Sequence, residues 1–245
     1  MEISAVIPVY NEQGNIIPLY SELKSALEKT SDTFEIIFIN DGSTDNTLTE
    51  LETLKDIRII DLGKNMGQSA AFSAGFKAAK GDIVISLDGD GQNDPKDIPA
   101  LVSTLKDKQL DVVAGWRKNR HDSKSIVLIS SIGRILRFIL FGDRIHDSGC
   151  SLRAYKREAV SDLVLEGKMH RYIMLILRSK GFKIGEIVVN HRPRVFGVSK
   201  YNASKIWGGT MDLLRLRFGE ELMKITAISL LTTAIILVLY YSRFL

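Results

Sequence analysis

The sequence predicts an α/β protein in which a mostly parallel sheet carries helices on both faces. Short runs rich in β-branched residues alternate with longer stretches that have the periodicity of amphipathic helices. The strand-like runs are continuously apolar, which is typical of parallel strands that are covered on both faces. Apolar residues make up 45% of the chain and charged residues 25%, so disordered and low-complexity classes are excluded.

The expected elements follow one another in a regular order. The strands are expected at Ile3–Pro8, Phe34–Asn40, Ile57–Asp61, Ile83–Leu87 and Asp111–Gly115. The helices between them are expected at about Gly14–Lys29, Asp45–Lys55, Gln68–Lys80 and Pro95–Lys106. Asp94 supports the start of the last helix, because an acidic N-cap accepts a backbone hydrogen bond and Pro95 suits the first helical position.

The surplus apolar residues lie at the end of the chain. A mean hydropathy of +0.04 is high for a soluble protein, and Ile225–Tyr241 carries no charge. At ~1.5 Å per residue this run covers roughly 25 Å, and flanking residues extend it toward the ~30 Å of a hydrocarbon core. We therefore expect a transmembrane helix over residues 223–242; the alternative is a buried core helix.

Charge and cysteine content indicate the compartment. Basic residues are frequent just before the apolar run, whereas only Arg243 follows it. The positive-inside rule then places residues 1–200, the expected catalytic domain, in the cytoplasm of a single-pass protein of the cytoplasmic (inner) membrane. A net charge of +4 is too mild to indicate nucleic-acid binding. The one cysteine, Cys150, is expected to be a packed residue in a reducing compartment.

Two further segments have amphipathic character. Residues 125–142 form an apolar helix pattern with a narrow polar stripe at Ser130, Gly133, Arg134 and Arg137. We expect this helix at the membrane interface, with its arginines toward lipid phosphate or the site; a core helix whose stripe faces the cleft is the alternative. Residues 201–222 are expected to form a juxtamembrane helix.

Polar clusters follow the predicted strands, at the edge where open α/β sheets bind ligands. Asp41 follows the second strand, Asp88 and Asp90 follow the fourth, and Arg117 follows the fifth. In an extended segment Asp88, Asp90 and Gln92 point to one side, so that they present three oxygens. Such ligands favour Mg²⁺ or Mn²⁺ that takes its remaining ligands from phosphate.

Several motifs together resemble the family 2 glycosyltransferases. The motifs are IPVYNE at Ile7–Glu12, NDGSTD at Asn40–Asp45, NMGQSAAFSAGFKAAKGD at Asn65–Asp82 and LDGDGQNDP at Leu87–Pro95. Three more resemble the polyprenyl-phosphate glycosyltransferases, the dolichol-phosphate mannose synthase-like branch: DVVAGWR at Asp111–Arg117, DSGCSLRAYKR at Asp147–Arg157 and HRPRVFGVSKY at His191–Tyr201. The similarity runs in consistent order through about residues 3–205.

The resemblance implies the GT-A fold, which is Rossmann-like, and a set of site residues. It implies a nucleotide-sugar donor, a divalent metal and a lipid phosphate acceptor in the membrane. The residues implied for the nucleotide sugar are Pro8, Tyr10, Glu12, Asp41, Asp88, Gly89 and Arg117. Those for the metal are Asp88, Asp90 and Gln92, and a carboxylate near Asp147 faces the reacting sugar in the family.

The chemistry of a phosphate acceptor is consistent with these residues. A lipid monophosphate is already anionic at neutral pH, so it needs relief from repulsion by the donor diphosphate more than it needs a base. Arg117, Arg134, Arg194 and Lys200 are candidates to hold the acceptor phosphate or to stabilise developing charge. Asp147 is either a base, a stabiliser of positive charge on the sugar, or a loop residue bonded to backbone.

We therefore expect an inverting glycosyltransferase of cell-envelope biogenesis. Its donor is of the GDP-mannose or UDP-hexose type, and its acceptor is undecaprenyl or dolichyl phosphate at the cytoplasmic membrane face. The alternatives are transfer to a sugar or lipid hydroxyl, and an inactive membrane scaffold of the same fold. A membrane partner and a homo-oligomer are both consistent with a chain that has one expected span.

Overall fold

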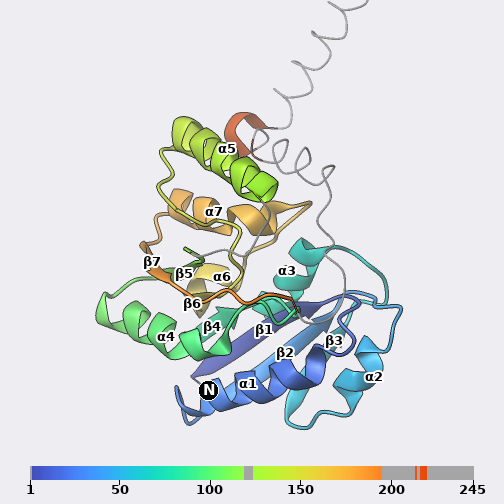
Figure 1. Ribbon diagram of the computed structural model, residues 1–245. Coiled ribbons are helices and arrows are strands. Elements are labelled where there is room, and N and C mark those ends of the chain that lie inside the picture. Colours follow the sequence, from blue (N-terminus) through green and yellow to red (C-terminus); the bar gives the residue numbers. More distant parts are fainter. Residues whose placement is uncertain (1, 119–123, 195–212, 214–215, 220–245) are drawn as a thin grey trace, which may run out of the picture.

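A computed structural model describes residues 2–118, 124–194, 213 and 216–219. Its centre is a seven-stranded sheet with the order β3-β2-β1-β4-β6-β5-β7 (Figure 1). All neighbouring strands are parallel except β6, which runs antiparallel to both β4 and β5. The strands are β1 (Ile3–Val9), β2 (Phe34–Asn40), β3 (Ile57–Asp61), β4 (Ile83–Ser86), β5 (Val112–Trp116), β6 (Arg153–Lys156) and β7 (Ile184–Val188).

Helices connect the strands and cover the sheet. The bounds are α1 (Ile16–Glu28), α2 (Thr47–Glu52), α3 (Gln68–Ala78), the 3₁₀ turn η1 (Pro95–Asp97), α4 (Ile98–Asp107), α5 (Lys124–Phe141), α6 (Arg157–Val160), the 3₁₀ turn η2 (Met169–Tyr172) and α7 (Ile173–Ser179). The predicted mostly parallel α/β sheet is therefore confirmed, and the strands and helices predicted over residues 3–142 are present within a few residues of their expected bounds. The Asp94 carboxylate accepts the Lys96 backbone N–H at 3.1 Å, as expected for a cap. Two strands, β6 and β7, were not expected.

Two apolar layers lie on opposite faces of the sheet. Side chains alternate along β1, so that Ile3 and Ile7 pack into the layer beneath α1 and α4, while Val6 packs into the layer beneath α3 and α7. Phe76 of α3 lies in this second layer and meets Tyr155 of β6 edge-on, with ring centroids 5.5 Å apart. The strands are covered on both faces, which is why their sequences are continuously apolar.

A buried carboxylate lies near the amino end of β2, away from the edge that carries the predicted site. Glu35 accepts hydrogen bonds from Ser4 Oγ at 2.7 Å, Arg58 Nη1 at 2.7 Å and the Lys80 backbone N–H at 2.8 Å. Burial alone would raise the pKa of Glu35, but these donors outweigh it and lower the pKa below its ordinary value of 4.5. The ionised form is therefore favoured in the folded chain.

This carboxylate makes stability sensitive to acid. A lowered folded pKa stabilises the protein above the unfolded pKa of about 4.3, and the stabilisation is lost as pH falls through the folded pKa. We expect Glu35→Gln to lower the free energy of unfolding by about 1–3 kcal/mol at pH 7, because it leaves buried donors poorly matched. The difference should shrink in urea titrations repeated at progressively lower pH. Glu28→Gln, at an exposed position of α1, is the matched control; an equal loss in both variants would contradict the assignment.

Helix α5 presents its polar stripe differently from expectation. Arg137 is buried, and its Nε lies 3.0 Å from Asp143 Oδ2, while Arg178 of α7 pairs with the other oxygen of Asp143. Arg137 therefore faces protein rather than lipid phosphate. The exposed side of the helix carries Ile135, Phe138 and Ile139 instead.

The expected membrane segments lie largely beyond the described part of the chain. Residues 223–242, the expected transmembrane helix, are outside it, as is most of the expected juxtamembrane helix over residues 201–222. Within the ranges that the structure describes, none of the helices combines the length and the apolar character that a membrane span requires. Leu213 is buried against Tyr172 and Leu175.

Candidate active site

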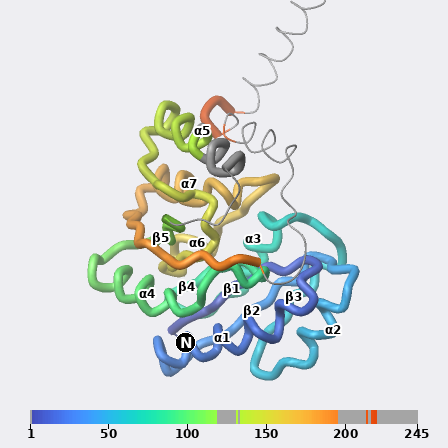
Figure 2. The backbone as a smooth tube through the Cα atoms, in the orientation of Figure 1, coloured from blue at the N-terminus to red at the C-terminus, as the bar shows by residue number. Residues whose placement is uncertain are grey.

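The candidate site lies at the carboxyl ends of β1, β2, β4 and β5. Residues 189–194 follow β7 and are called here the return segment, because they run back across the sheet toward the ends of β4 and β1 (Figure 2). Asn93 and His191 form an antiparallel bridge, and the Arg192 backbone N–H donates to the Gln92 carbonyl at 2.9 Å. The return segment is therefore held against the loop that carries Asp88, Asp90 and Gln92.

Asp41 joins the end of β2 to the start of α3. Its buried carboxylate accepts hydrogen bonds from the backbone N–H groups of Met66 at 2.7 Å and Gly67 at 3.0 Å. Gly42 has a φ of +67°, and a Cβ there would lie 2.4 Å from the Lys64 carbonyl carbon, so only glycine lets the two loops approach this closely. The contact fixes the first turn of α3 beside the end of β4.

Asp88 follows β4 and is held by two neighbouring loops. Gln68, the first residue of α3, donates from Nε2 to Asp88 Oδ1 at 2.6 Å. The Asp88 backbone N–H donates to Ser151 Oγ at 3.1 Å. Burial and the nearby charge of Asp90 raise the pKa of Asp88 to about 6. Two carboxylates this close favour a cation between or beside them.

The positive charge beside Asp90 is supplied by the guanidinium group of Arg194. Arg194 Nη2 lies 2.5 Å from Asp90 Oδ2, and its Nη1 lies 3.6 Å from Glu12 Oε2. Glu12 is buried, and Asn15 Nδ2 donates to its Oε2 at 2.8 Å. The side chain of Arg194 therefore links the loop after β1 to the loop after β4.

The oxygen set at this edge fits a hard divalent cation. Asp88 and Asp90 supply carboxylates, and Gln92 supplies an amide whose Nε2 donates to the Arg192 carbonyl at 3.4 Å. No group of three or more His, Cys, Asp or Glu side chains suited to a metal occurs among the described residues. The raised pKa of Asp88 and the guanidinium on Asp90 both indicate a need for positive charge here. Two carboxylates are too few for a metal whose ligands all come from the protein. They suit Mg²⁺ or Mn²⁺ that also takes ligands from phosphate.

Arg117 and Asp147 form a buried bidentate pair beside these carboxylates. Arg117 Nε lies 2.7 Å from Asp147 Oδ2, and its Nη2 lies 3.0 Å from Oδ1. Burial alone would lower the pKa of Arg117, but the hydrogen bonds and charge of Asp147 raise it above its usual range. Asp147 also accepts the Gly149 backbone N–H at 3.2 Å. Both of its oxygens are therefore engaged, which disfavours the role of a free general base.

The loop that carries Asp147 is held from both sides by residues that the sequence did not single out. Glu186 of β7 accepts the His146 backbone N–H at 3.0 Å, and the His146 ring stacks on Trp116 with centroids 4.2 Å apart. Arg153 of β6 is buried and donates to the Ser148 carbonyl at 2.7 Å. Of these, Arg153 lies in the quoted DSGCSLRAYKR motif and Trp116 in the quoted DVVAGWR motif, so both could have been considered. The same holds for Gln68, the contact of Asp88, which begins a predicted helix at this edge.

The other predicted residues are placed as follows. Pro8 lies in β1 opposite Ile39, and Tyr10 is half-buried just after that strand. Gly89 packs against β1, since a Cβ on it would lie 2.5 Å from Val9 Cγ1. Arg134 is exposed on α5, and in the described part of the chain no hydrogen bond or ion pair joins it to the site. Lys200 lies outside the described residues.

Cys150 is a packed residue. It is fully buried, and burial raises the pKa of its thiol to about 11. A thiol with so high a pKa is almost wholly protonated at neutral pH, which disfavours a nucleophilic role.

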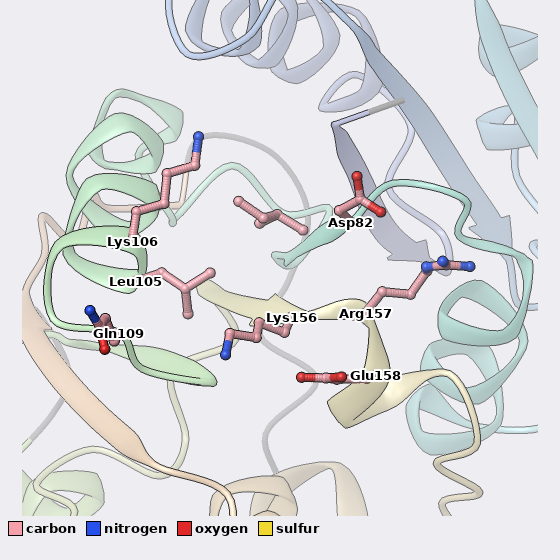
Figure 3. Close-up of a pocket in the computed structure, with 8 residues that line it drawn as sticks. Asp82, Leu105, Lys106, Gln109, Lys156, Arg157 and Glu158 are labelled. Atoms are coloured by element: carbon pink, nitrogen blue, oxygen red, sulfur yellow. The ribbon is translucent and has the colours of Figure 1, made fainter.

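A separate hollow lies at the opposite end of the sheet. Figure 3 shows its lining, in which Asp82 precedes β4 and Lys156 and Arg157 end β6 and begin α6. Lys106 pairs with Glu2 at 2.5 Å, and Lys156 pairs with Asp111 at 2.7 Å. The charges of both lysines are therefore already balanced by neighbouring carboxylates.

Comparison with known proteins gives a consistent result. The family model for glycosyl transferase family 2 matches residues 4–164. A dodecaprenyl-phosphate galacturonate synthase from Rhizobium johnstonii is 38% identical over 231 residues, which cover 89% of this chain and 67% of that protein. An undecaprenyl-phosphate 4-deoxy-4-formamido-L-arabinose transferase from Yersinia enterocolitica is 34% identical, over 97% of this chain and 76% of that protein. The chain thus spans about two thirds to three quarters of these relatives.

Solved structures show the same fold. The crystal structure of glucosyl-3-phosphoglycerate synthase from Mycobacterium tuberculosis in complex with Mn²⁺ and uridine-diphosphate-glucose superimposes with a TM-score of 0.70. The match covers 88% of this chain and 78% of that one, at 19% sequence identity. At this identity the likeness concerns the arrangement of helices and strands.

Proposed function

The chain belongs to glycosyl transferase family 2 and is a glycosyltransferase, and from this premise we propose that it transfers a sugar from a nucleotide-diphosphate sugar to a polyprenyl phosphate. The proposed place of reaction is the cytoplasmic face of the inner membrane. The names of both relatives specify a polyprenyl phosphate, dodecaprenyl in one and undecaprenyl in the other. We propose a UDP-linked or GDP-linked hexose or hexuronate as the donor.

One observation carries the proposal. Two carboxylates, Asp88 and Asp90, meet at the ends of parallel strands with the cationic side chains of Arg117 and Arg194 beside them. A site that must bring a donor diphosphate and an acceptor phosphate together has to offset the repulsion between the two anions, and carboxylates suited to a divalent cation beside two guanidinium groups fit this need.

The roles proposed for the residues follow from these contacts. Pro8, Tyr10, Glu12 and Asp41 lie at the ends of β1 and β2, where they would border the nucleoside. Asp88 and Asp90, with Gln92, would hold Mg²⁺ or Mn²⁺. A divalent ion there supplies charge stabilisation to the leaving diphosphate.

The reaction proposed for the chain is a single in-line displacement. The acceptor phosphate oxygen attacks the anomeric carbon, the bond from that carbon to the nucleoside diphosphate breaks, and the configuration inverts. The nucleophile is already an anion, so no side chain needs to take a proton from it. Asp147 would then orient Arg117 toward the phosphates rather than act as a base.

The decisive experiment offers a panel of radiolabelled nucleotide sugars to the purified chain in vesicles that contain undecaprenyl or dolichyl phosphate. Each reaction is run with Mn²⁺, with Mg²⁺ and with EDTA. We expect label to enter the lipid fraction for one donor, only with metal, and proton NMR of the product to show an inverted anomeric centre. Transfer to a hydroxyl-bearing glycan or lipid instead, or a retained configuration, would contradict the proposal.

The exposed side of α5 is proposed to rest in the membrane interface. Phe138 and Ile139 lie one turn after Ile135, and the three side chains are 54%, 69% and 54% exposed in the order Phe138, Ile139, Ile135. Water-exposed apolar rows of this kind suit the boundary between headgroups and acyl chains.

A fluorescent probe tests this placement. An environment-sensitive dye on Ile139→Cys should shift to shorter wavelength when the chain is reconstituted in anionic vesicles. The same dye on Lys108→Cys, at the exposed end of α4, is the control and should not shift. The buried Cys150, with its raised thiol pKa, is expected to stay unlabelled at neutral pH. Equal spectra at both positions would contradict the orientation.

A further inference from the structure

The side chain of Arg194 contacts Asp90, one of the two carboxylates proposed to bind the metal. Its Nη2 contacts Asp90, and its Nη1 lies within ion-pair distance of Glu12. The Arg194 side chain is 20% exposed, and the partners are 12% and 9% exposed. The contact is therefore well shielded from solvent, and its electrostatic energy is stronger than that of a surface pair.

A divalent cation and this guanidinium compete for the same oxygen. Asp90 Oδ1 accepts the Gln92 backbone N–H at 3.0 Å, whereas Oδ2 is held by Arg194, so a metal that binds through Oδ2 takes the place of the guanidinium. Two positive groups cannot share this oxygen at contact distance without strong repulsion. Entry of the metal with its nucleotide must move the arginine side chain.

The neighbouring arginine shows that such a movement can be local. Arg192 pairs with Glu22 of α1, with Nη2 2.7 Å from Oε2, and also donates to the Asn93 carbonyl at 3.0 Å. Its backbone N–H and the bridge at His191 attach the return segment to the loop after β4. Release of Arg194 therefore leaves the anchored part of the segment in place and frees one guanidinium next to the donor phosphates.

We propose that Arg194 is an exchanging counter-cation, which neutralises Asp90 in the donor-free enzyme and passes to a phosphate group once the metal-bound donor arrives. This inference rests on the proposed function and deepens it. The consequence is an order of binding: the donor releases the arginine, and the released arginine then helps to hold the anionic acceptor. If the acceptor phosphate bound before the donor, Arg194 would still be paired with Asp90 and would not be available to bind it.

The exchange predicts that a variant without Arg194 binds the metal more tightly than the wild-type chain. Removal of an arginine from a phosphate-binding site normally weakens ligand binding, whereas removal of a competitor strengthens metal binding. We expect Arg194→Gln to bind Mn²⁺ about 5-fold or more tightly than the wild-type chain in the absence of nucleotide, a typical size for coupling between two ligands. The readout is the electron paramagnetic resonance signal of free Mn²⁺ during titration of the full chain.

Two matched variants control the experiment. Arg194→Lys keeps the charge and should bind Mn²⁺ within about 2-fold of wild type. Arg192→Gln removes a nearby charge that is paired with Glu22, and it should also leave Mn²⁺ affinity near wild type. Circular dichroism shows whether Arg194→Gln is folded, and the Lys variant shows whether the charge of residue 194 accounts for the change in Mn²⁺ affinity.

Each outcome decides the question. Equal Mn²⁺ affinity for wild type and Arg194→Gln overturns the exchange while the proposed transfer reaction stands. An equal rise in Arg192→Gln also overturns it, because the effect is then general electrostatics. An absence of Mn²⁺ binding in every variant overturns both the exchange and the metal of the proposed function.

Discussion

Asp90→Asn should reduce sugar transfer by about two to three orders of magnitude, a loss typical for removal of one group that stabilises charge in a transition state. The reason is that the variant keeps the shape of Asp90 but loses the negative charge that the proposed metal needs. Mn²⁺ affinity should fall in parallel, since a neutral amide is a weaker ligand for a hard cation. The measurements are initial rates of lipid glycosylation and Mn²⁺ titration.

The control is a carboxylate of the same chain that lies elsewhere. Asp107→Asn changes an exposed residue at the end of α4 and should alter neither quantity. The melting temperature of Asp90→Asn should fall somewhat below that of wild type, because Arg194 loses its partner in a contact shielded from solvent, so both variants are assayed at a temperature where they are folded. Full activity of Asp90→Asn would remove Asp90 from the proposed metal site.

The second large effect concerns the buried pair of Arg117 and Asp147. Arg117→Met should lower the free energy of unfolding by about 3–5 kcal/mol, because it removes the bidentate guanidinium partner of the buried Asp147 carboxylate. Transfer activity should fall by about two orders of magnitude or more, measured at a temperature where the variant is folded. Urea unfolding followed by tryptophan fluorescence reports on the same region, since Trp116 precedes Arg117.

A double-mutant cycle separates the two roles open to Asp147. If Asp147 acts by orienting Arg117, then Asp147→Asn combined with Arg117→Met should be no less active than Arg117→Met alone. If Asp147 is instead an independent base, the losses should add on a logarithmic scale. The bidentate contact at 2.7 and 3.0 Å is the reason to expect the first result.

The sequence was sufficient to predict the part of the fold that is built from local patterns. Continuously apolar strands such as Ile3–Val9 and Phe34–Asn40 are recognisable because both of their faces are buried. The strands that were missed lack this signal. β6 begins with Arg153 and is four residues long, and β7 is only partly buried and has Glu186 at its centre. The sequence of β6 is largely polar, and the short aliphatic run of β7 is interrupted by Gly185 and Glu186.

The site was predictable as a set of strand ends but not as a set of contacts. That Asp41, Asp88 and Arg117 gather at one edge follows from parallel topology. That Arg117 pairs with Asp147, 30 residues away, and that Arg194 reaches Asp90 across 104 residues depend on how loops fold back over that edge. The inward direction of Arg137 was missed for the same reason, since its partner Asp143 lies beyond the end of the helix.

The reversed direction of β6 determines which residues it can contribute to catalysis. For a strand that runs in the common direction, the residues that follow it lie at the edge of the sheet that carries the site. For a strand that runs in the reverse direction, the residues that precede it lie there. Residues 147–151 therefore reach this edge on the way into β6 rather than on the way out. A protein engineer who wishes to alter sugar preference would thus vary the stretch directly upstream of this strand, while changes directly downstream of it, in α6, would fall at the opposite end of the sheet.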